Sequence, residues 1–182
     1  EKKNEAFMTA GQVQYVAKAG NFLNKGLVYT GALRMLKVIM GYDYLWNNVR
    51  VKGGAYGCMS SFTRTGDCFF VSYRDPNLQR TIEVYEKAGE YLRNFVADER
   101  TLTQYIIGTI SDMDAPMSPS AYGAYSLGAY LSGITDEMIQ KDRDEVLNVT
   151  EEDIRKLADY VEAVLEDNCV CVVGTAPKIE ES

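Results

Sequence analysis

The apolar run NCVCVVG, residues 168–174, most restricts the fold that this chain can adopt. It has the composition of a buried strand, yet a long block of helical pattern separates it from the other β-prone segments. A strand needs neighbouring strands to satisfy its backbone hydrogen bonds, so this one must return to a sheet built by the first half of the chain. The sequence therefore predicts an α+β domain, with helices packed on one face of a mostly antiparallel sheet.

The remaining elements follow from hydrophobic periodicity. Residues 5–20 alternate loosely, with Val13, Tyr15 and Ala17 on one face, which is typical of strands. The other predicted elements are a helix over about 29–49 with a break at Gly41, a hairpin around the RTG turn at 64–66, helices over about 77–95 and from 98 onward, and helices starting near 118, 135 and 150. The last helix carries an apolar stripe of Ile154, Leu157, Ala158, Val161 and Leu165. We expect one domain over residues 1–182, with unstructured tails at 1–4 and 178–182.

Helix boundaries are marked by capping residues. Typical helix starts are Ser118 with Pro119, Thr135 and Thr150, and a typical exit is Gly133. Gly123 and Gly128 would weaken the helix that they interrupt, so we expect close packing against a neighbour there. Tyr122, Tyr125 and Tyr130 lie at near-helical spacing on the same segment. We interpret them as core or rim packing, with a ligand-stacking face as the alternative.

Composition excludes several functions. The formal net charge is −7, and nucleic-acid binding depends on Lys and Arg contacts to phosphate, so the sequence argues against it and against docking on anionic lipid. The apolar runs are too short to cross a bilayer. The N-terminal EKKNEAFMTA has neither a signal-peptide pattern nor an initiator Met, so we expect a piece of a longer protein. The chain has no histidine, so a self-contained hydrolase would have to use carboxylates or lysine.

The four cysteines are Cys58, Cys68, Cys169 and Cys171, without Cys-x-x-Cys spacing. We interpret them as reduced thiols of a cytoplasmic protein. Cys169 and Cys171 share one face of a strand and could complete a Cys₄ zinc site with the other two. Atypical spacing and an expected inward placement favour buried, apolar cysteine instead. The acidic groups TDEM, KDRDE and TEED lie near helix starts, where capping and solvation explain them.

The stretch VRVKGGAYG, residues 49–57, holds the strongest candidate site. Gly53 and Gly54 allow backbone angles closed to other residues and let a ligand approach closely. Arg50, at a helix end, and Tyr56, at a strand start, then lie on the two sides of one bend. Their donors could together hold a substrate carbonyl or a developing oxyanion. From the residues alone the plainer interpretation is favoured: a solvated helix-end cation, a half-buried strand residue and a glycine connector.

The stretch DYLWNNVRVKGGAYG resembles the C-terminal region of the insulinase/pitrilysin-type zinc metallopeptidases, closest to the branch that includes presequence protease. FFVSYRDPNLQRTIEVYEKAGEYL, the segment from SPSAYGAYSLGAYLSG to KLADYV, and VCVVGT fit the same branch. The likeness runs from about Phe7 to Val173, and its most specific element is the Arg-x₅-Tyr spacing across Gly-Gly.

The resemblance implies a LuxS/MPP-like metallohydrolase fold and a place as the fourth domain of a peptidase whose two halves close around a peptide. In that family the inverted zinc motif H-x-x-E-H lies in the N-terminal half, and the C-terminal half binds no metal. The resemblance further implies that Arg50 and Tyr56 bind the substrate backbone and stabilise the tetrahedral intermediate, with Gly53 and Gly54 as the hinge. Zinc and the general base would come from the absent half, so we expect this chain alone to be inactive and metal-free.

The implied partners are peptide substrates and the N-terminal half of the same protein. Faces that the missing domains normally cover would be exposed in an isolated piece, so we expect that it could homo-oligomerise. The alternative within the same clan is a non-catalytic structural or partner-binding subunit, against which Arg50 and Tyr56 argue. An H-x-x-E-H motif upstream of Glu1 would separate the two.

Overall fold

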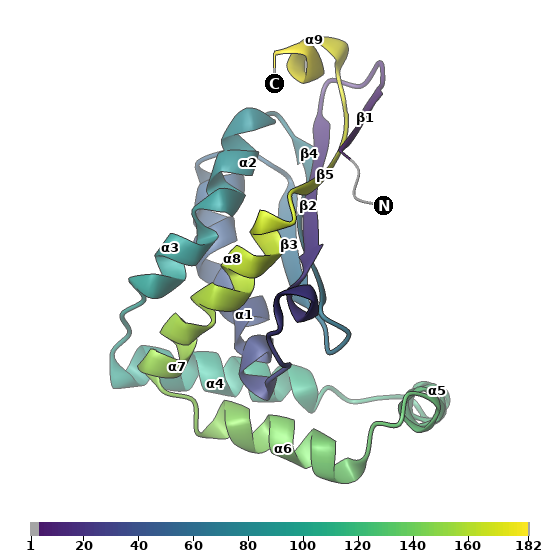
Figure 1. The fold of residues 1–182 in the computed structure, drawn as a ribbon, viewed down its shortest axis with the longest axis vertical. Coiled ribbons are helices and arrows are strands. Elements are labelled where there is room, and N and C mark those ends of the chain that lie inside the picture. The colour runs from purple at the N-terminus through teal and green to yellow at the C-terminus, as the bar shows by residue number, and fades with distance from the viewer. Residues whose placement is uncertain (1–3, 182) are drawn as a thin grey trace.

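The computed structural model describes residues 4–181 and contains one five-stranded sheet (Figure 1). The strands are β1 (Glu5–Met8), β2 (Gln14–Asn21), β3 (Gly57–Phe62), β4 (Asp67–Asp75) and β5 (Cys169–Gly174). Their order across the sheet is β1-β5-β2-β4-β3. β1 and β5 are parallel and the other neighbours are antiparallel, which confirms the mostly antiparallel sheet. The late strand β5 returns between β1 and β2, as its isolation in the sequence requires.

Helices fill the rest of the chain. The α-helices are α1 (Arg34–Ile39), α2 (Gln79–Glu86), α3 (Ala88–Arg93), α4 (Glu99–Met113), α5 (Pro119–Leu131), α6 (Asp136–Leu147), α7 (Glu151–Lys156), α8 (Ala158–Glu166) and α9 (Ala176–Glu180). Short 3₁₀ segments are η1 (Phe22–Lys25) and η2 (Gly31–Leu33), and π segments are η3 (Met40–Tyr44) and η4 (Trp46–Val51). The break expected at Gly41 is a change to π geometry within one continuous helical stretch. The helix expected over 77–95 divides at Lys87 into α2 and α3.

The core lies between one face of the sheet and the helices that cover it, chiefly α1, α2, α3 and α8 (Figure 1). Phe70 of β4 stacks on the fully buried Tyr85 of α2, with ring centroids 5.5 Å apart. Val16 and Val172 contribute from the neighbouring strands. The apolar stripe predicted for the helix starting near 150 is buried throughout, although that helix divides at Leu157 into α7 and α8. Its members are Ile154, Leu157, Ala158, Val161 and Leu165.

The covered face of strand β2 carries two buried polar residues beside the core residue Val16. The face that carries Tyr15 is the open one, and the covered face includes Gln14 and Lys18, both almost fully buried. Lys18 Nζ lies 2.9 Å from a Glu86 carboxylate oxygen, and Gln14 Oε1 accepts the backbone N–H of Thr175 at 2.9 Å. Buried polar groups are stable only with such partners. Loose alternation in the sequence could not distinguish the two faces, because the partners come from distant segments.

Predicted caps form as expected. The side chains of Ser118, Thr135 and Thr150 each accept a backbone N–H in the first turn of the helix that follows. Thr150 also forms a reciprocal capping box with Asp153. Gly133 ends the segment after α5 in the left-handed region, with φ of 66°. These boundaries depend only on neighbours in the chain, which is why the sequence predicts them.

Helix α5 contradicts the packing expected for it. It lies apart from the body of the domain (Figure 1), and none of its residues is buried. Within residues 4–181 no heavy atom apart from the chain neighbours and the backbone of α5 itself lies within 4 Å of a Cβ placed on Gly123 or Gly128. Tyr130 is 81% exposed, so core packing is wrong for it within this chain. An uncharged helix of this kind is normally covered, and this domain does not provide the cover.

The chain ends also differ in part from the expected tails. Residues 178–180 belong to α9, whose Ile179 packs against the core, so the predicted tail is wrong there. Asn4 accepts the backbone N–H of Val170 at 2.9 Å. The remainder of the two predicted tails includes residues 1–3 and 182, which lie outside the described residues. Within the described chain no helix combines the length and apolar character needed to cross a bilayer.

A close approach of α8 to the sheet yields a test of the packing. A Cβ on Gly20 of β2 would lie 2.2 Å from the carbonyl oxygen of Val164 in α8. Because backbone atoms cannot move aside cheaply, Gly20→Ala is expected to lower the free energy of unfolding by about 2 kcal/mol. The matched change Gly123→Ala meets open space in α5 and should leave stability equal or raise it by up to about 1 kcal/mol. Urea unfolding of both variants measures the difference, and equal midpoints would contradict the packing described.

Candidate functional site

A widened helix positions Arg50. After α1 the chain continues through η3 and η4, where the Lys52 N–H donates to the Asn47 carbonyl at 3.0 Å, a π-type bond. Such wide turns are rare and often occur at functional sites. Arg50 lies in the last turn, and its guanidinium carbon stands 4.0 Å from the centre of the Trp46 ring. The stacking holds the cation at the helix surface while leaving Arg50 exposed.

The Gly53–Gly54 turn is specified by sterics. The Gly54 N–H donates to the Arg50 carbonyl at 2.8 Å, and the Ala55 N–H donates to the Val49 carbonyl at 3.2 Å. A Cβ on Gly53 would lie 2.3 Å from the Val49 carbonyl oxygen, and Gly54 has φ of 83°. Both positions therefore require glycine, for close approach and for backbone conformation respectively.

Tyr56 lies on the far side of this turn and is 61% exposed. Its ring meets Tyr73 edge-on at 5.7 Å, and the Arg74 guanidinium carbon lies 5.4 Å from its centre. Its N–H donates to the Arg74 carbonyl at 3.2 Å. Arg74 itself has φ of 50°, an uncommon conformation for a residue other than glycine. Within the described residues no hydrogen bond or ring contact joins Arg50 to Tyr56, and the cation beside the tyrosine is Arg74.

A buried carboxylate supports the turn from below. Asp75 is fully buried at the end of β4 and accepts the Thr81 hydroxyl at 2.7 Å and the Asn77 N–H at 2.9 Å. The Asn77 side-chain amide donates to the Gly53 carbonyl at 2.6 Å. Asp75 thus connects β4, the start of α2 and the glycine turn. Neither Asp75 nor Asn77 was a candidate from sequence. A signal was available in the DPN stretch directly after a strand, since Asp and Asn commonly bond to nearby backbone.

Cys58 lies just behind the site, on the second residue of β3. Burial raises the pKa of its thiol to about 11, although the nearby positive charge of Arg50 acts in the opposite direction. The thiol is therefore protonated at neutral pH and is not a ready nucleophile.

The cysteines do not gather into a metal site. The strand register puts Cys58 and Cys68 on the covered face of the sheet, whereas Cys169 and Cys171 lie on the open face, where Cys171 is exposed. Cys169 and Cys171 do share one face, but the inward placement expected for them is wrong. Among residues 4–181 no group of three or more His, Cys, Asp or Glu side chains could hold a metal ion.

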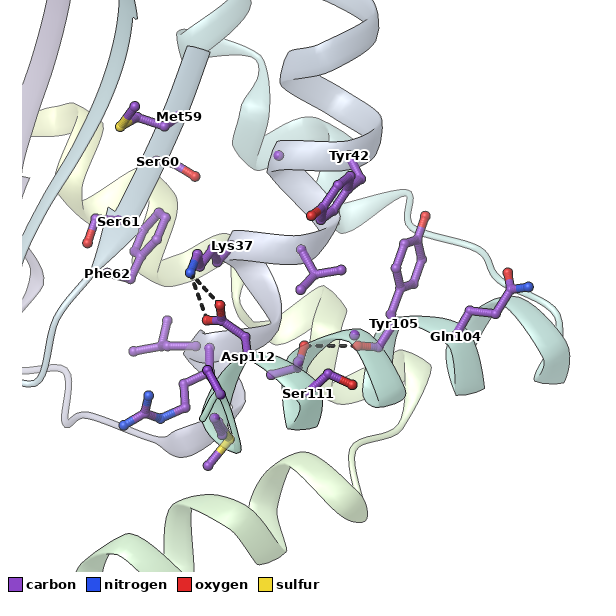
Figure 2. Close-up of a pocket in the computed structure, with 18 of the residues that line it drawn as sticks. Lys37, Tyr42, Met59, Ser60, Ser61, Phe62, Gln104, Tyr105, Ser111 and Asp112 are labelled. Carbon is purple, nitrogen blue, oxygen red and sulfur yellow. Dashed lines mark hydrogen bonds and ion pairs between the residues drawn. The ribbon is translucent and has the colours of Figure 1, made fainter. Parts of the chain in front are cut away.

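A groove of about 1140 Å³ runs alongside β3, next to the glycine turn (Figure 2). Its walls are β3, the helical stretch of α1 and η3, and α4. Lys37 of α1 and Asp112 of α4, both exposed, form an ion pair at the groove, with Nζ–oxygen distances of 2.7 and 2.8 Å. Sequence reasoning did not find this groove, because its walls come from three separate segments.

A five-stranded, mostly antiparallel sheet with helices on one face defines the class of protein. This is a domain with the M16 peptidase fold. The solved inactive domain of an M16 peptidase from Pseudomonas fluorescens superposes with a TM-score of 0.67 over 97% of this chain and 44% of that chain, at 14% identity. The chain belongs to the presequence protease family, since the family model described as the PreP C-terminal domain matches residues 4–177 of its sequence.

Two curated relatives agree. The protein HypA of Clostridium perfringens is 48% identical over 100% of this chain. Presequence protease 1, chloroplastic/mitochondrial, of Arabidopsis thaliana is 38% identical over 98% of it. The chain spans only 19% and 17% of the length of these two relatives.

The network below the turn predicts a local effect. Asn77→Ala removes the hydrogen bond to the Gly53 carbonyl and should lower the free energy of unfolding by about 1 kcal/mol. The backbone amides of residues 54 and 55 should then exchange their hydrogens faster, because the free energy of local opening at the turn falls. Asn94→Ala is the control, because its side-chain amide donates to the Glu90 carbonyl at an exposed helix end. Hydrogen exchange by mass spectrometry resolves the two regions. Faster exchange confined to other parts of the chain would contradict the support assigned to Asn77.

The pKa of Cys58 predicts its reactivity. With a pKa of about 11, roughly one thiol in a thousand is ionised at pH 8, and alkylation should speed up about tenfold per pH unit from 8 to 10. Arg50→Ala removes the charge that favours the thiolate, so its pKa rises further and labelling slows. Iodoacetamide labelling read by peptide mass spectrometry measures this, with exposed Cys171 as the internal control. Labelling of Cys58 that does not respond to Arg50→Ala would show that the guanidinium does not act on this thiol.

Proposed function

We propose that this chain is the last domain of a longer zinc-dependent peptidase, in which it binds peptide substrate while binding no metal itself. Its family membership and its small share of the length of its relatives support this. The Arabidopsis relative is named a protease, and the whole-protein activity suggested by that name is proteolysis. The zinc and the general base then lie in the N-terminal half of the polypeptide, which is the first partner of this domain.

Arg50 and Tyr56 are the residues that we assign to the substrate. A guanidinium donates up to five N–H bonds and a phenol one O–H bond, and both side chains are exposed on the two sides of the glycine turn. Such donors can bind the carbonyl oxygen of an extended peptide. They can also stabilise the oxyanion that develops when that carbonyl is attacked, a contribution that grows when closure excludes water.

The observation that carries this assignment is the rigid support of the turn between the two donors. Trp46 stacks under Arg50, Tyr73 contacts Tyr56, and the buried Asp75 network holds the Gly53 carbonyl. Electrostatic stabilisation of a transition state is effective when the donors are fixed before the reaction. Arg50 and Tyr56 are held in place by their neighbours, are exposed, and do not bond to each other. This combination is typical of a binding site rather than of a structural contact.

The rest of the surface supports contacts with further protein. Helix α5 and the open face of the sheet expose apolar side chains, among them Tyr130 and Phe7. The remainder of the polypeptide would cover such faces, or a second copy in the isolated chain. A non-catalytic, partner-binding role for the parent protein remains the second candidate, and the kinetics below separate the two.

The assignment of Arg50 and Tyr56 makes a kinetic prediction. In the longer polypeptide that contains this domain, Arg50→Ala and Tyr56→Phe should each lower kcat/KM for peptide cleavage on the order of 10²-fold, the effect of losing one oxyanion donor. The loss should fall mainly on kcat if the donors act in the transition state. Steady-state assays with a fluorogenic peptide measure both constants.

Two exposed residues outside the site serve as controls. Arg100→Ala on α4 and Tyr130→Phe on α5 make the same chemical changes elsewhere and should leave kcat/KM within about twofold. Unchanged kinetics for Arg50→Ala and Tyr56→Phe would exclude the proposed role. Absence of any peptidase activity in the unmodified longer protein would favour the partner-binding alternative.

A further inference from the structure

The groove beside β3 follows the open edge of the sheet. β3 is the last strand in the order, so β4 pairs with only one of its sides. Five consecutive residues, 58–62, line the groove. Side chains of consecutive strand residues point to opposite faces, so a groove that touches all five must run along the strand edge. Figure 2 shows this edge with α1 and α4 opposite it.

The edge presents unused backbone groups to the groove. The Thr63 N–H donates to the Asp67 carbonyl, and the register continues with Ser61 opposite Phe69. Hydrogen-bonded pairs alternate along an antiparallel ladder, so the N–H and C=O of Ser60 point away from β4. Cys58 and Phe62 share this orientation. A row of free donors and acceptors at a sheet edge is a template for another strand.

Ser60 adds an independent sign of a missing partner. Its Oγ is buried and has no hydrogen-bond partner within the described residues, and Ser60 as a whole is 8% exposed. Figure 2 shows its hydroxyl on the groove side of β3, facing the helix that carries Tyr42. Buried hydroxyls are normally paired, but Ser72 Oγ on β4 is also unpaired within residues 4–181 and lies outside the groove, so the Ser60 hydroxyl supports a ligand only together with the open strand edge.

The groove begins close to the Arg50–Tyr56 site, because its lining on β3 starts at Cys58, two residues after Tyr56. Tyr56 directly precedes β3, and Cys58 at the near end lies close enough to Arg50 for the guanidinium charge to act on its thiol. Tyr42 lines the groove and is exposed, and the exposed Trp46, on which Arg50 stacks, follows it four residues later on the same helical stretch. Of the charged residues that line the groove, Lys37 and Asp112 pair with each other and Arg34 pairs with Asp142.

We propose that this groove binds an extended segment of the peptide substrate as an added β-strand on β3, continuing from the residues held at Arg50 and Tyr56. The inference rests on the proposed function and names a second, longer subsite for it. β3 is six residues long, about 20 Å, so it can pair with roughly six residues of peptide. Backbone pairing is independent of peptide sequence, while the aromatic residues that line the groove, among them Tyr42 and Tyr105, favour apolar side chains.

Two glycines allow the groove to be filled without disturbing the fold. Outside the backbone of its own helix, a Cβ on Gly41, in η3, meets no heavy atom within 4 Å, and one on Gly108, in α4, meets only the two Val38 methyls, at 3.4 and 3.9 Å. Gly41→Trp and Gly108→Leu therefore project into the groove from two different walls. Gly41→Ala is the matched control, because it changes the same backbone position without occupying the space.

The test uses the longer polypeptide and two fluorogenic peptides with the same cleavage site, one of about 8 residues and one of about 25, since only the longer can span both subsites. Gly41→Trp and Gly108→Leu should raise KM at least about tenfold for the long peptide and leave kcat/KM for the short peptide within about twofold. Gly41→Ala should leave both peptides unaffected. Ser60→Ala should raise KM for the long peptide a few-fold.

The outcomes separate this inference from the proposed function. If filling the groove leaves KM for the long peptide unchanged, or weakens both peptides equally while thermal unfolding is unaltered, the added-strand subsite is wrong. If Arg50→Ala leaves both peptides unaffected, the proposed function is wrong whatever the groove variants do. Loss for both peptides under Arg50→Ala together with loss for only the long peptide under Gly41→Trp supports both.

Discussion

Asp75 is the residue on which the candidate site depends. Its buried carboxylate accepts bonds from the residues that follow β4, and through Asn77 it fixes the Gly53 carbonyl. A buried charge is tolerated only when its acceptors are satisfied, so β4, α2 and the glycine turn are tied to one another. These hydrogen bonds therefore fix the turn that separates Arg50 from Tyr56. Gly53 and Gly54 do not make this turn flexible. Gly53 lets the chain pass close to the Val49 carbonyl, and the turn is held by hydrogen bonds.

The domain is covered on one side only. Helices bury one face of the sheet, while the other face and α5 expose apolar side chains. The exposed sheet face and the exposed helix α5 agree with a chain that spans about a fifth of the length of its curated relatives. The open edge of β3 belongs to the same pattern, since an unprotected edge strand is a liability unless something pairs with it.

Elements and boundaries were largely predictable. The hairpin around Gly66, the caps at Thr135 and Thr150, and the buried stripe shared by α7 and α8 all follow from residues close together in the chain. The candidate pair Arg50 and Tyr56 was found through spacing and a family resemblance. The sequence could not reveal Arg74 beside Tyr56, the Lys18–Glu86 pair or the unpartnered Ser60, because each depends on segments far apart.

By itself the sequence determined the α+β class, the order of elements and the return of the last strand to the sheet. These follow from periodicity and from the need of every strand to be hydrogen-bonded, which are local or chain-wide requirements. Only the tertiary structure decided which face of β2 is covered, on which side of the sheet Cys171 lies, and that a groove runs along β3. Each of these depends on contacts between elements distant in the chain. The hydrophobic periodicity of one element does not show which distant element it will contact.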